Sequence, residues 1–160
     1  MDDMQSTQAI SKRKRPWSWK NVRLPRRRED EISRNFQIDV YRAHLESQPN
    51  DVETLMELGN LYTLTGRVED GLEVDQRLVE IKPREPIFLY NYACSLALVK
   101  RVDEALEILE RAVEAGYDNL EYLEEDSDLD ALRDDPRYTR IVARLRLRDP
   151  AFEAEPEQNL

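Results

Sequence analysis

Apolar residues between Val52 and Pro83 follow two helical patterns separated by a break. Leu55, Leu58 and Tyr62 recur at i, i+3 and i+7, which places them on one face of a helix with 3.6 residues per turn. Gly66 ends this first helix, because glycine readily adopts the left-handed conformation common after a helix C-terminus. A second amphipathic helix follows and stops before Pro83, since proline cannot continue it. The apolar side of this second helix consists of Val68, Leu72, Leu78, Val79 and Ile81.

The same arrangement recurs one period later. Pro49 follows an earlier helix and Pro83 follows the second helix of this pair, and the two prolines are 34 residues apart. The positions 34 residues after the landmarks of the first helix pair are all apolar or small: Leu89, Tyr92, Ala93, Leu96 and Ala105. The period therefore predicts a second helix pair, with helices from Pro86 to about Leu98 and from about Val102 to Ala115.

The 34-residue period and the glycine inside the first helix resemble a tetratricopeptide repeat. In that family the glycine, here Gly59, lets the next helix approach closely, which offsets its cost of roughly 1 kcal/mol in a helix. Two positions depart from the family pattern: Asp75 stands where an aromatic is usual, and Lys100 where the turn glycine is usual. Because a lone buried carboxylate is costly, we expect the helix 68–81 to be rotated so that Asp75 is exposed and Val74 takes part of its place. The resemblance implies an all-α fold, a short α-solenoid of antiparallel helix pairs with capping helices.

Residues 29–48 predict one helix with two apolar edges. One edge consists of Ile32, Phe36, Val40 and Ala43, and the other of Ile38, Tyr41 and Leu45. By register this helix matches the second helix of a preceding repeat whose first helix is missing or degenerate, so we expect it to cap the stack. A helix with two apolar edges indicates more than one neighbour, and the second could be the arm that precedes it.

The segment after Gly116 resembles the closing segment found after many bacterial tetratricopeptide arrays, the end-of-group motif. The resemblance rests on Gly116, Leu120, Leu123, Asp128, Leu129, Leu132, Arg133, Asp135, Pro136 and Tyr138. The segment predicts a short helix near 119–125, a turn, and a last helix that starts near Pro136 with Asp135 as its N-cap. We expect the apolar side of this last helix to cover the open end of the stack: Tyr138, Ile141, Val142 and Leu145.

The chain thus divides into five parts. They are a disordered basic arm (1–28), an N-terminal capping helix (29–49), two tetratricopeptide repeats (50–117), a helical C-terminal cap (118–148) and a disordered acidic tail (149–160). The first 28 residues carry a net charge of +7, which leaves −17 for the rest of a chain whose total is −10. Such asymmetry indicates an interaction tail.

The arm combines basic residues with aromatic ones. Its candidate contact residues are Lys12, Arg13, Lys14, Arg15, Trp17, Trp19, Lys20, Arg23, Arg26, Arg27 and Arg28. They suit contact with nucleic-acid phosphates and bases, or with anionic lipid. In a nucleated cell the basic runs would also pass as nuclear-localisation patches. A solvated tail, or a tail bound to the acidic body of its own chain, explains the same composition, and the sequence leaves these alternatives open.

Catalytic and metal chemistry find little support in the sequence. There is no phosphate loop, no G-x-S-x-G and no Cys-x-x-Cys. Asp126, Asp128 and Asp130 have the spacing that opens an EF-hand calcium loop, but Ala131 and Arg137 stand where the loop needs glycine and glutamate. His44 and Cys94 are the only residues of their types and have no ligand companions, so we expect a half-buried or surface histidine and a structural thiol. We predict a non-enzymatic protein with no cofactor and no metal.

The sequence also limits where in the cell the protein is expected. No apolar run reaches the roughly 18 residues of a membrane span, and the basic N-terminus lacks the apolar region of a secretory signal. A single cysteine fits a reducing compartment. We expect a cytoplasmic protein, or a nuclear one in a nucleated cell.

The tetratricopeptide resemblance further implies a concave groove lined by the first helix of each repeat. By register the groove positions are Glu53, Met56, Glu57, Asn60, Thr63, Ile87, Tyr90, Asn91 and Cys94. We expect Asn60 and Asn91 to bind the backbone of an extended peptide, with apolar contacts around them and the two glutamates favouring a basic partner. Apolar contacts would come from Met56, Ile87 and Tyr90.

The two asparagines are 31 residues apart, as in the carboxylate clamp that binds chaperone C-terminal tails. Met56, Glu121 and Glu125 stand where that clamp needs cations, so we exclude chaperone tails. The predicted function is a non-catalytic adaptor or scaffold that binds a peptide or helix of another protein. The alternative is a nucleic-acid-associated factor that acts through the basic arm. The sequence does not indicate an oligomeric state.

Overall fold

The computed structural model describes residues 28–148 as a row of helices without strands in that range. The predictions for residues 1–27 and 149–160 lie outside this described range. The helices are α1 (Arg28–Ser47), α2 (Val52–Thr65), α3 (Val68–Ile81), α4 (Pro86–Leu98), α5 (Val102–Glu114), α6 (Leu120–Glu125), the 3₁₀-helix η2 (Ser127–Leu132) and α7 (Pro136–Arg146).

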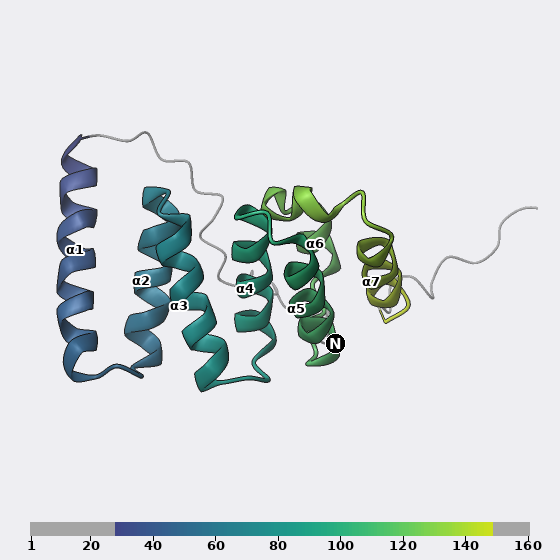
Figure 1. The fold of residues 1–160 in the computed structure, drawn as a ribbon, viewed down its shortest axis with the longest axis horizontal. Helices are drawn as coiled ribbons and strands as arrows, with labels where there is room; N and C mark the ends of the chain where they lie inside the picture. The colour runs from purple at the N-terminus through teal and green to yellow at the C-terminus, as the bar shows by residue number, and fades with distance from the viewer. Residues whose placement is uncertain (1–27, 149–160) are drawn as a thin grey trace, which may run out of the picture.

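Helices α1 to α5 stand side by side in chain order, joined by short connections, and α7 lies at the other end of the row from α1 (Figure 1). Helix α2 packs on α3 and α4 packs on α5, while α3 also packs on α4 and joins the two pairs. The predicted bounds of these four helices are confirmed to within one residue. The all-α, solenoid-like architecture is therefore the one expected from the 34-residue period.

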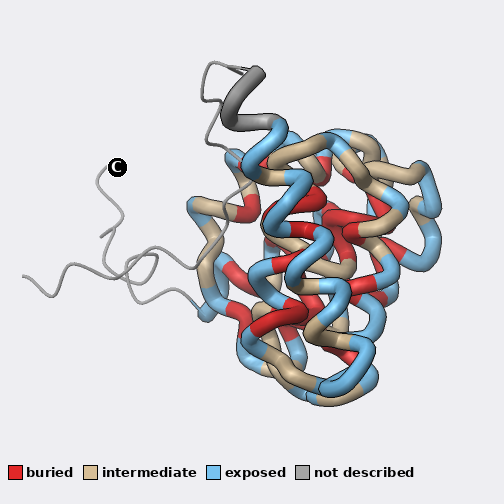
Figure 2. The backbone as a smooth tube through the Cα atoms, turned by 90° about the vertical axis from the view of Figure 1, so that its left-hand side faces the viewer, coloured by how far each residue is buried: buried red, intermediate tan, exposed pale blue. Residues whose placement is uncertain are grey.

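The apolar faces of all these helices meet in one continuous core. Ile38 of α1, Leu58 of α2 and Leu89 of α4 all belong to it, and so do Leu109 of α5 and Leu129 of η2. Seen from the α1 end of the row, the buried positions gather on the inward sides of the helices and the exposed positions lie outside (Figure 2). No helix pair can bury its own apolar face, so each neighbour supplies the cover that the next one lacks.

The close approach between α2 and α3 depends on Gly59. A Cβ atom placed on Gly59 would lie 3.3 Å from Val74 Cγ1, so even alanine would force Val74 to shift. The expected exposure of Asp75 is wrong: this residue is buried, and its Oδ2 accepts a hydrogen bond from the Ser95 hydroxyl of α4. Val74 is buried as well, so the two side chains share the interface and neither replaces the other.

The turns after α2 and α4 have the same hydrogen bonds, with glycine in one and lysine in the other. Gly66 donates its N–H to the Thr63 carbonyl, and the residue after it donates to the Tyr62 carbonyl. Lys100 donates to the Ala97 carbonyl, and its successor donates to the Leu96 carbonyl. Both residues adopt the left-handed conformation, with φ of 72° at Gly66 and 64° at Lys100. Lys100 thus adopts the left-handed backbone conformation that the family's turn glycine would adopt. Because Lys100 has a Cβ atom, this conformation is strained there.

Replacing Lys100 with glycine is therefore expected to stabilise the fold. The left-handed conformation costs roughly 1–2 kcal/mol in a residue with a Cβ atom, and the extra freedom of glycine in the unfolded chain removes part of the gain. We expect the free energy of unfolding to rise by about 0.5–1 kcal/mol, measured by urea denaturation. The reciprocal change Gly66→Lys should lower the free energy of unfolding by a similar amount. A loss of stability in Lys100→Gly would contradict this account of the turn.

Helix α1 packs with one of its two apolar edges. Ile38 is buried, and Tyr41 and Leu45 are half-buried against the core. The other edge, which begins at Ile32, is exposed among the described residues. His44 is half-buried, as predicted, and its Nε2 lies 3.1 Å from Asp51 Oδ2.

The C-terminal helix α7 lies at the other end of the row from α1 (Figure 1). Asp135 caps α7, as predicted, because its carboxylate accepts a hydrogen bond from the Arg137 N–H at 2.8 Å. The guanidinium and backbone N–H of Arg137 lower the pKa of Asp135 to about 2. The apolar side of α7 is buried, as expected: Tyr138, Ile141, Val142 and Leu145. The predicted turn between the last two helices is instead the 3₁₀-helix η2, and it packs on α4.

Within residues 28–148, no helix has both the length and the apolar character needed to cross a membrane.

Candidate partner-binding surface

Helix α2 presents a mixed apolar and acidic side that is open in this structure. Met56 is 42% exposed. Glu53 and Glu57 are exposed beside it. Neither glutamate forms an ion pair with another residue of the described range. The spacing of three and four residues places these side chains on one side of the helix, away from buried Leu55 and Leu58.

Asn60 and Thr63 extend this side toward the end of α2. Asn60 is half-buried, and its Oδ1 has no hydrogen-bond partner among the described residues. The Thr63 hydroxyl donates to the Gly59 carbonyl at 3.1 Å, so its proton is already used within the helix. An unpaired buried amide oxygen costs roughly 1–3 kcal/mol, and a donor from a bound partner would recover that cost.

On α4, two of the four predicted groove positions remain accessible. Ile87 and Asn91 are half-buried, which leaves part of each side chain accessible. The prediction that Tyr90 and Cys94 face an open groove is wrong, since Tyr90 is 1% exposed and Cys94 is fully buried. The reason is tertiary: η2 packs on α4, and its N-cap Asp126 reaches both side chains.

A buried aromatic cluster holds this C-terminal segment against α4. The rings of Tyr90 and Tyr117 are stacked, with centroids 4.2 Å apart and planes 2° from parallel. The ring of Tyr122, in α6, meets Tyr90 in a tilted contact at 5.8 Å. Stacked and tilted aromatic pairs add roughly 0.5–1.5 kcal/mol each beyond the area that they bury. Three tyrosines thus join α4 to the residues that follow α5.

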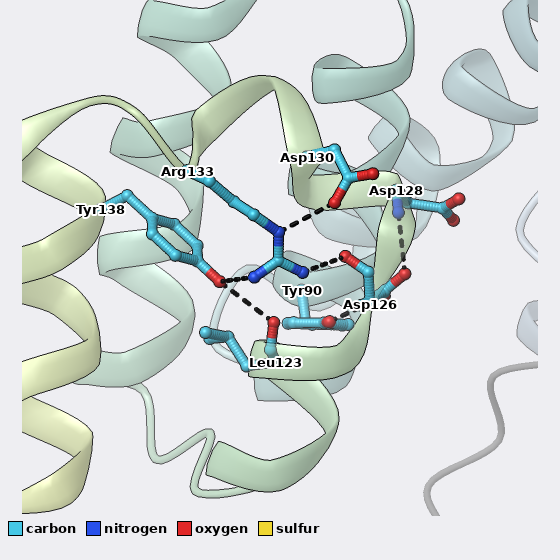
Figure 3. Close-up of polar contacts among 7 residues, drawn as sticks. All are labelled: Tyr90, Leu123, Asp126, Asp128, Asp130, Arg133 and Tyr138. Atoms are coloured by element: carbon cyan, nitrogen blue, oxygen red, sulfur yellow. Dashed lines mark hydrogen bonds and ion pairs between the residues drawn. The ribbon is translucent and has the colours of Figure 1, made fainter.

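Asp126 lies at the centre of this contact. The Tyr90 hydroxyl donates to Asp126 Oδ2 at 2.8 Å, and the Cys94 thiol lies 3.6 Å from the same oxygen. Its other oxygen, Oδ1, accepts the Asp128 N–H at 3.0 Å, which caps η2. The Asp126 carbonyl accepts a hydrogen bond from Arg133 at 3.0 Å (Figure 3). The buried carboxylate of Asp126 therefore caps η2 and also accepts a hydrogen bond from Tyr90 of α4.

Burial controls the protonation of the tyrosines around Asp126. Loss of solvent raises the pKa of Tyr90, Tyr117 and Tyr122 above its ordinary value, and for Tyr90 the increase is the largest. Their hydroxyls consequently stay protonated throughout the neutral range, so Tyr90 remains a donor to Asp126.

The hydrogen bonds of the Asp126 carboxylate differ from the arrangement of a calcium loop. In such a loop the carboxylate oxygens converge on a cation. In the described residues no three His, Cys, Asp or Glu side chains form a metal-binding group.

Comparison with known proteins places this architecture in a family. Residues 53–151 match the family model described as A/B hydrolase-like, N-terminal domain. The chain belongs to this family. The matched segment begins in α2 and runs through α7, so it contains the second helix pair and the whole closing segment.

Two curated proteins are similar to parts of the chain. Superkiller protein 3 of Saccharomyces cerevisiae is 34% identical over 74 residues, which cover 46% of this chain and 5% of that protein. A chloroplastic protein of Arabidopsis thaliana is 28% identical over 103 residues, which cover 62% of this chain and 30% of that protein. The chain therefore spans less than a third of either relative.

A solved structure supports the fold. The crystal structure of MamA superposes with a TM-score of 0.61 at 20% sequence identity, covering 78% of this chain and 73% of that one. MamA is a tetratricopeptide-like helical solenoid, and at this identity the likeness shows the architecture alone. The protein is thus an all-α solenoid of tetratricopeptide-like helix pairs.

The basic arm, from Lys12 to Arg27, lies outside the described residues, and Arg28 is the first residue of α1. Its predicted contact with nucleic acid or lipid stays a prediction. Sequence reasoning missed the roles of Asp126 and Tyr117. Asp126 could have been recognised as an N-cap, because aspartate is a preferred residue at the start of a helical turn.

Proposed function

We propose that this chain is a non-catalytic adaptor that binds a peptide or helix of a protein partner on one surface of the solenoid. We define the α2–α4 surface by its accessible residues: Glu53, Met56, Glu57, Asn60, Thr63, Ile87 and Asn91. The observation that carries the proposal is the unpaired Oδ1 of Asn60, which lies next to an exposed Met56. Tetratricopeptide-like solenoids commonly use the corresponding face for binding.

The chemistry of this surface defines the kind of partner. A peptide N–H is the donor that the Asn60 amide oxygen lacks, and rotation of the amide group would bring the two together. Met56 supplies a flexible apolar contact that adapts to different side chains. Glu53 and Glu57 have no internal counter-ion among the described residues, so they favour lysine or arginine in the partner. The partner is therefore an extended or helical segment with apolar and basic residues.

We assign no reaction to this chain, for reasons that lie in its helices and its buried polar groups. The family description names an N-terminal domain, and the matched residues that the structure describes form only helices around an apolar core. The polar cluster at Asp126 is buried and serves packing between helices. We also assign residues 118–148 to a closing cap of the end-of-group kind, because η2 and α7 pack on the second repeat.

The asparagines provide the test. In the full chain, Asn60→Ala together with Asn91→Ala should weaken binding of the captured partner by about 1 kcal/mol per lost hydrogen bond. That corresponds to a dissociation constant roughly 30-fold higher for the double variant, measured by titration calorimetry with the purified partner segment. Asn35→Ala is the matched control, since Asn35 is exposed on α1 outside this surface. An unchanged dissociation constant in the double variant would exclude the α2–α4 surface as the binding site.

A further inference from the structure

Helix α1 carries an exposed apolar stripe that the described residues leave uncovered. The α1 stripe consists of Ile32, Phe36, Val40 and Ala43. The first three are 66%, 68% and 48% exposed, and among the described residues they make up most of the large hydrophobic side chains left in solvent. Their spacing of four residues makes them one continuous strip along the helix. A contiguous apolar strip of this kind marks a contact surface.

Among the described residues, no neighbouring element covers the stripe. Helix α1 stands at the end of the row, and its extensive contacts are with α2 (Figure 1). Val40 lies 34 residues before Val74, which packs at Gly59 of the helix preceding its own. The equivalent preceding helix for α1 would come from residues 18–31, but α1 itself already begins at Arg28. Val40 is thus the stripe residue whose counterpart one period later packs on a preceding helix.

We propose that the segment Trp17–Leu24 of the same molecule docks on the α1 stripe and closes the N-terminal end of the core. This segment contains the bulky apolar residues of the basic arm: Trp17, Trp19, Val22 and Leu24. Pro25 separates it from α1, so it does not extend that helix and instead turns back along its surface. The apolar side chains of the segment meet the stripe, and its basic side chains remain at the edges.

The chain is long enough for this contact. Residues 25–27 join the segment to Arg28, where α1 begins. An extended stretch from Trp17 to Leu24 spans roughly 23 Å. The helix rises only about 16 Å from Ile32 to Ala43. The segment can therefore cover the whole stripe while it runs antiparallel to α1.

Charge favours this occupant over a second copy of α1. Asp39 and Glu46 are exposed on α1 and form no ion pair with another described residue. Lys20 and Arg23 lie within the docking segment, so opposite charges meet at the edge of the contact. A second copy of α1 would bring the same carboxylates together with exposed Arg42 beside them, whereas the segment Trp17–Leu24 contains no acidic residue. The docked arm would hold Trp17 and Trp19 against its own chain and keep them from stacking on nucleic-acid bases.

Tryptophan fluorescence tests the docking directly, because Trp17 and Trp19 are the only tryptophans in the chain. In the full-length protein we expect emission at a shorter wavelength than in the urea-unfolded chain, with several-fold weaker quenching by acrylamide. Phe36→Asp places a charge in the stripe and should shift the emission to that of the unfolded chain. Phe36→Leu keeps the stripe apolar and should retain the protected emission.

Further variants separate docking on α1 from its alternatives. Met56→Asp alters the α2–α4 surface and should leave the tryptophan signal unchanged, so this test is independent of the proposed adaptor function. Loss of the signal in Met56→Asp but not in Phe36→Asp would place the arm on α2 and overturn the inference. A solvent-exposed tryptophan signal in the unaltered protein would overturn it as well. So would sedimentation of the unaltered protein as a dimer that Phe36→Asp dissociates, since a second copy would then cover the stripe.

Discussion

Leu89→Ala is expected to lower the free energy of unfolding by about 3–5 kcal/mol. Leu89 is fully buried in α4, the helix that has α3 on one side and α5 on the other. Removing its side chain loses apolar burial and leaves a cavity that packed helices on both sides can only partly fill. A protein of this size has a total stability of roughly 5–15 kcal/mol, so this loss is a large share of the total.

Urea denaturation followed by far-UV circular dichroism measures the effect. The matched control is Leu147→Ala, because Leu147 is 71% exposed just after α7. The control should change the free energy of unfolding by no more than about 0.5 kcal/mol. A loss below about 1 kcal/mol in Leu89→Ala would mean that the two helix pairs do not share the core described for them.

Much of the fold could be predicted because its signals are local or periodic. The 34-residue spacing gives both helix pairs, since the same side-chain pattern must recur wherever one repeat packs on the next. Gly66 and Asp135 mark helix ends through backbone chemistry that depends on the nearest few residues. The buried side of α7 follows from its apolar spacing alone.

The errors concern contacts between residues far apart in the sequence. Asp75 was expected in solvent because no partner lies near it, but Ser95 reaches it from the next helix pair. Tyr90 and Cys94 were expected in the groove because their register matches exposed positions of the family. Asp126, 36 residues after Tyr90, buries both of them. Helical periodicity shows which side of a helix a residue occupies, but it does not show which later segment will cover that side.

Because Tyr90 is buried where η2 packs on α4, the expected binding surface is smaller than the predicted groove. A groove along every first helix would let a long peptide follow the whole stack. Here η2 packs on α4 and Tyr90 and Cys94 are buried, so the accessible predicted positions are those on α2 together with Ile87 and Asn91 of α4. A short segment therefore fits this surface better than a long extended one. Partner specificity would then depend on a few contacts near Met56 and Asn60.

Asp126→Ala should release the C-terminal segment from α4. The variant removes the acceptor of the Tyr90 hydroxyl and the cap of η2, and it leaves the buried hydroxyl without its partner. Hydrogen bonds to a buried carboxylate are worth roughly 1.5–3 kcal/mol, so we expect a total loss of about 2–4 kcal/mol. Asp126→Asn keeps an acceptor oxygen and should lose less.

Cys94 reports this release, because it is the chain's single cysteine and lies fully buried beside Asp126. The rate at which a thiol reagent labels Cys94 under native conditions measures how often the segment opens. A loss of about 2 kcal/mol in local stability corresponds to labelling that is roughly 30-fold faster. Asp130→Ala is the matched control: its exposed carboxylate pairs with Arg133, and its removal should leave the labelling rate nearly unchanged.

A comparison with Leu55→Ala separates local opening from global unfolding. Leu55 is buried in α2, which has no extensive contact with η2, so its loss destabilises the whole solenoid without touching the contact at Asp126. If the closing segment opens as a unit, Asp126→Ala will accelerate labelling of Cys94 more than Leu55→Ala does at equal loss of global stability. Equal acceleration would mean that Cys94 becomes accessible only when the whole chain unfolds. In that case Asp126 would stabilise the solenoid as a whole, and the closing segment would not be a separable cover on α4.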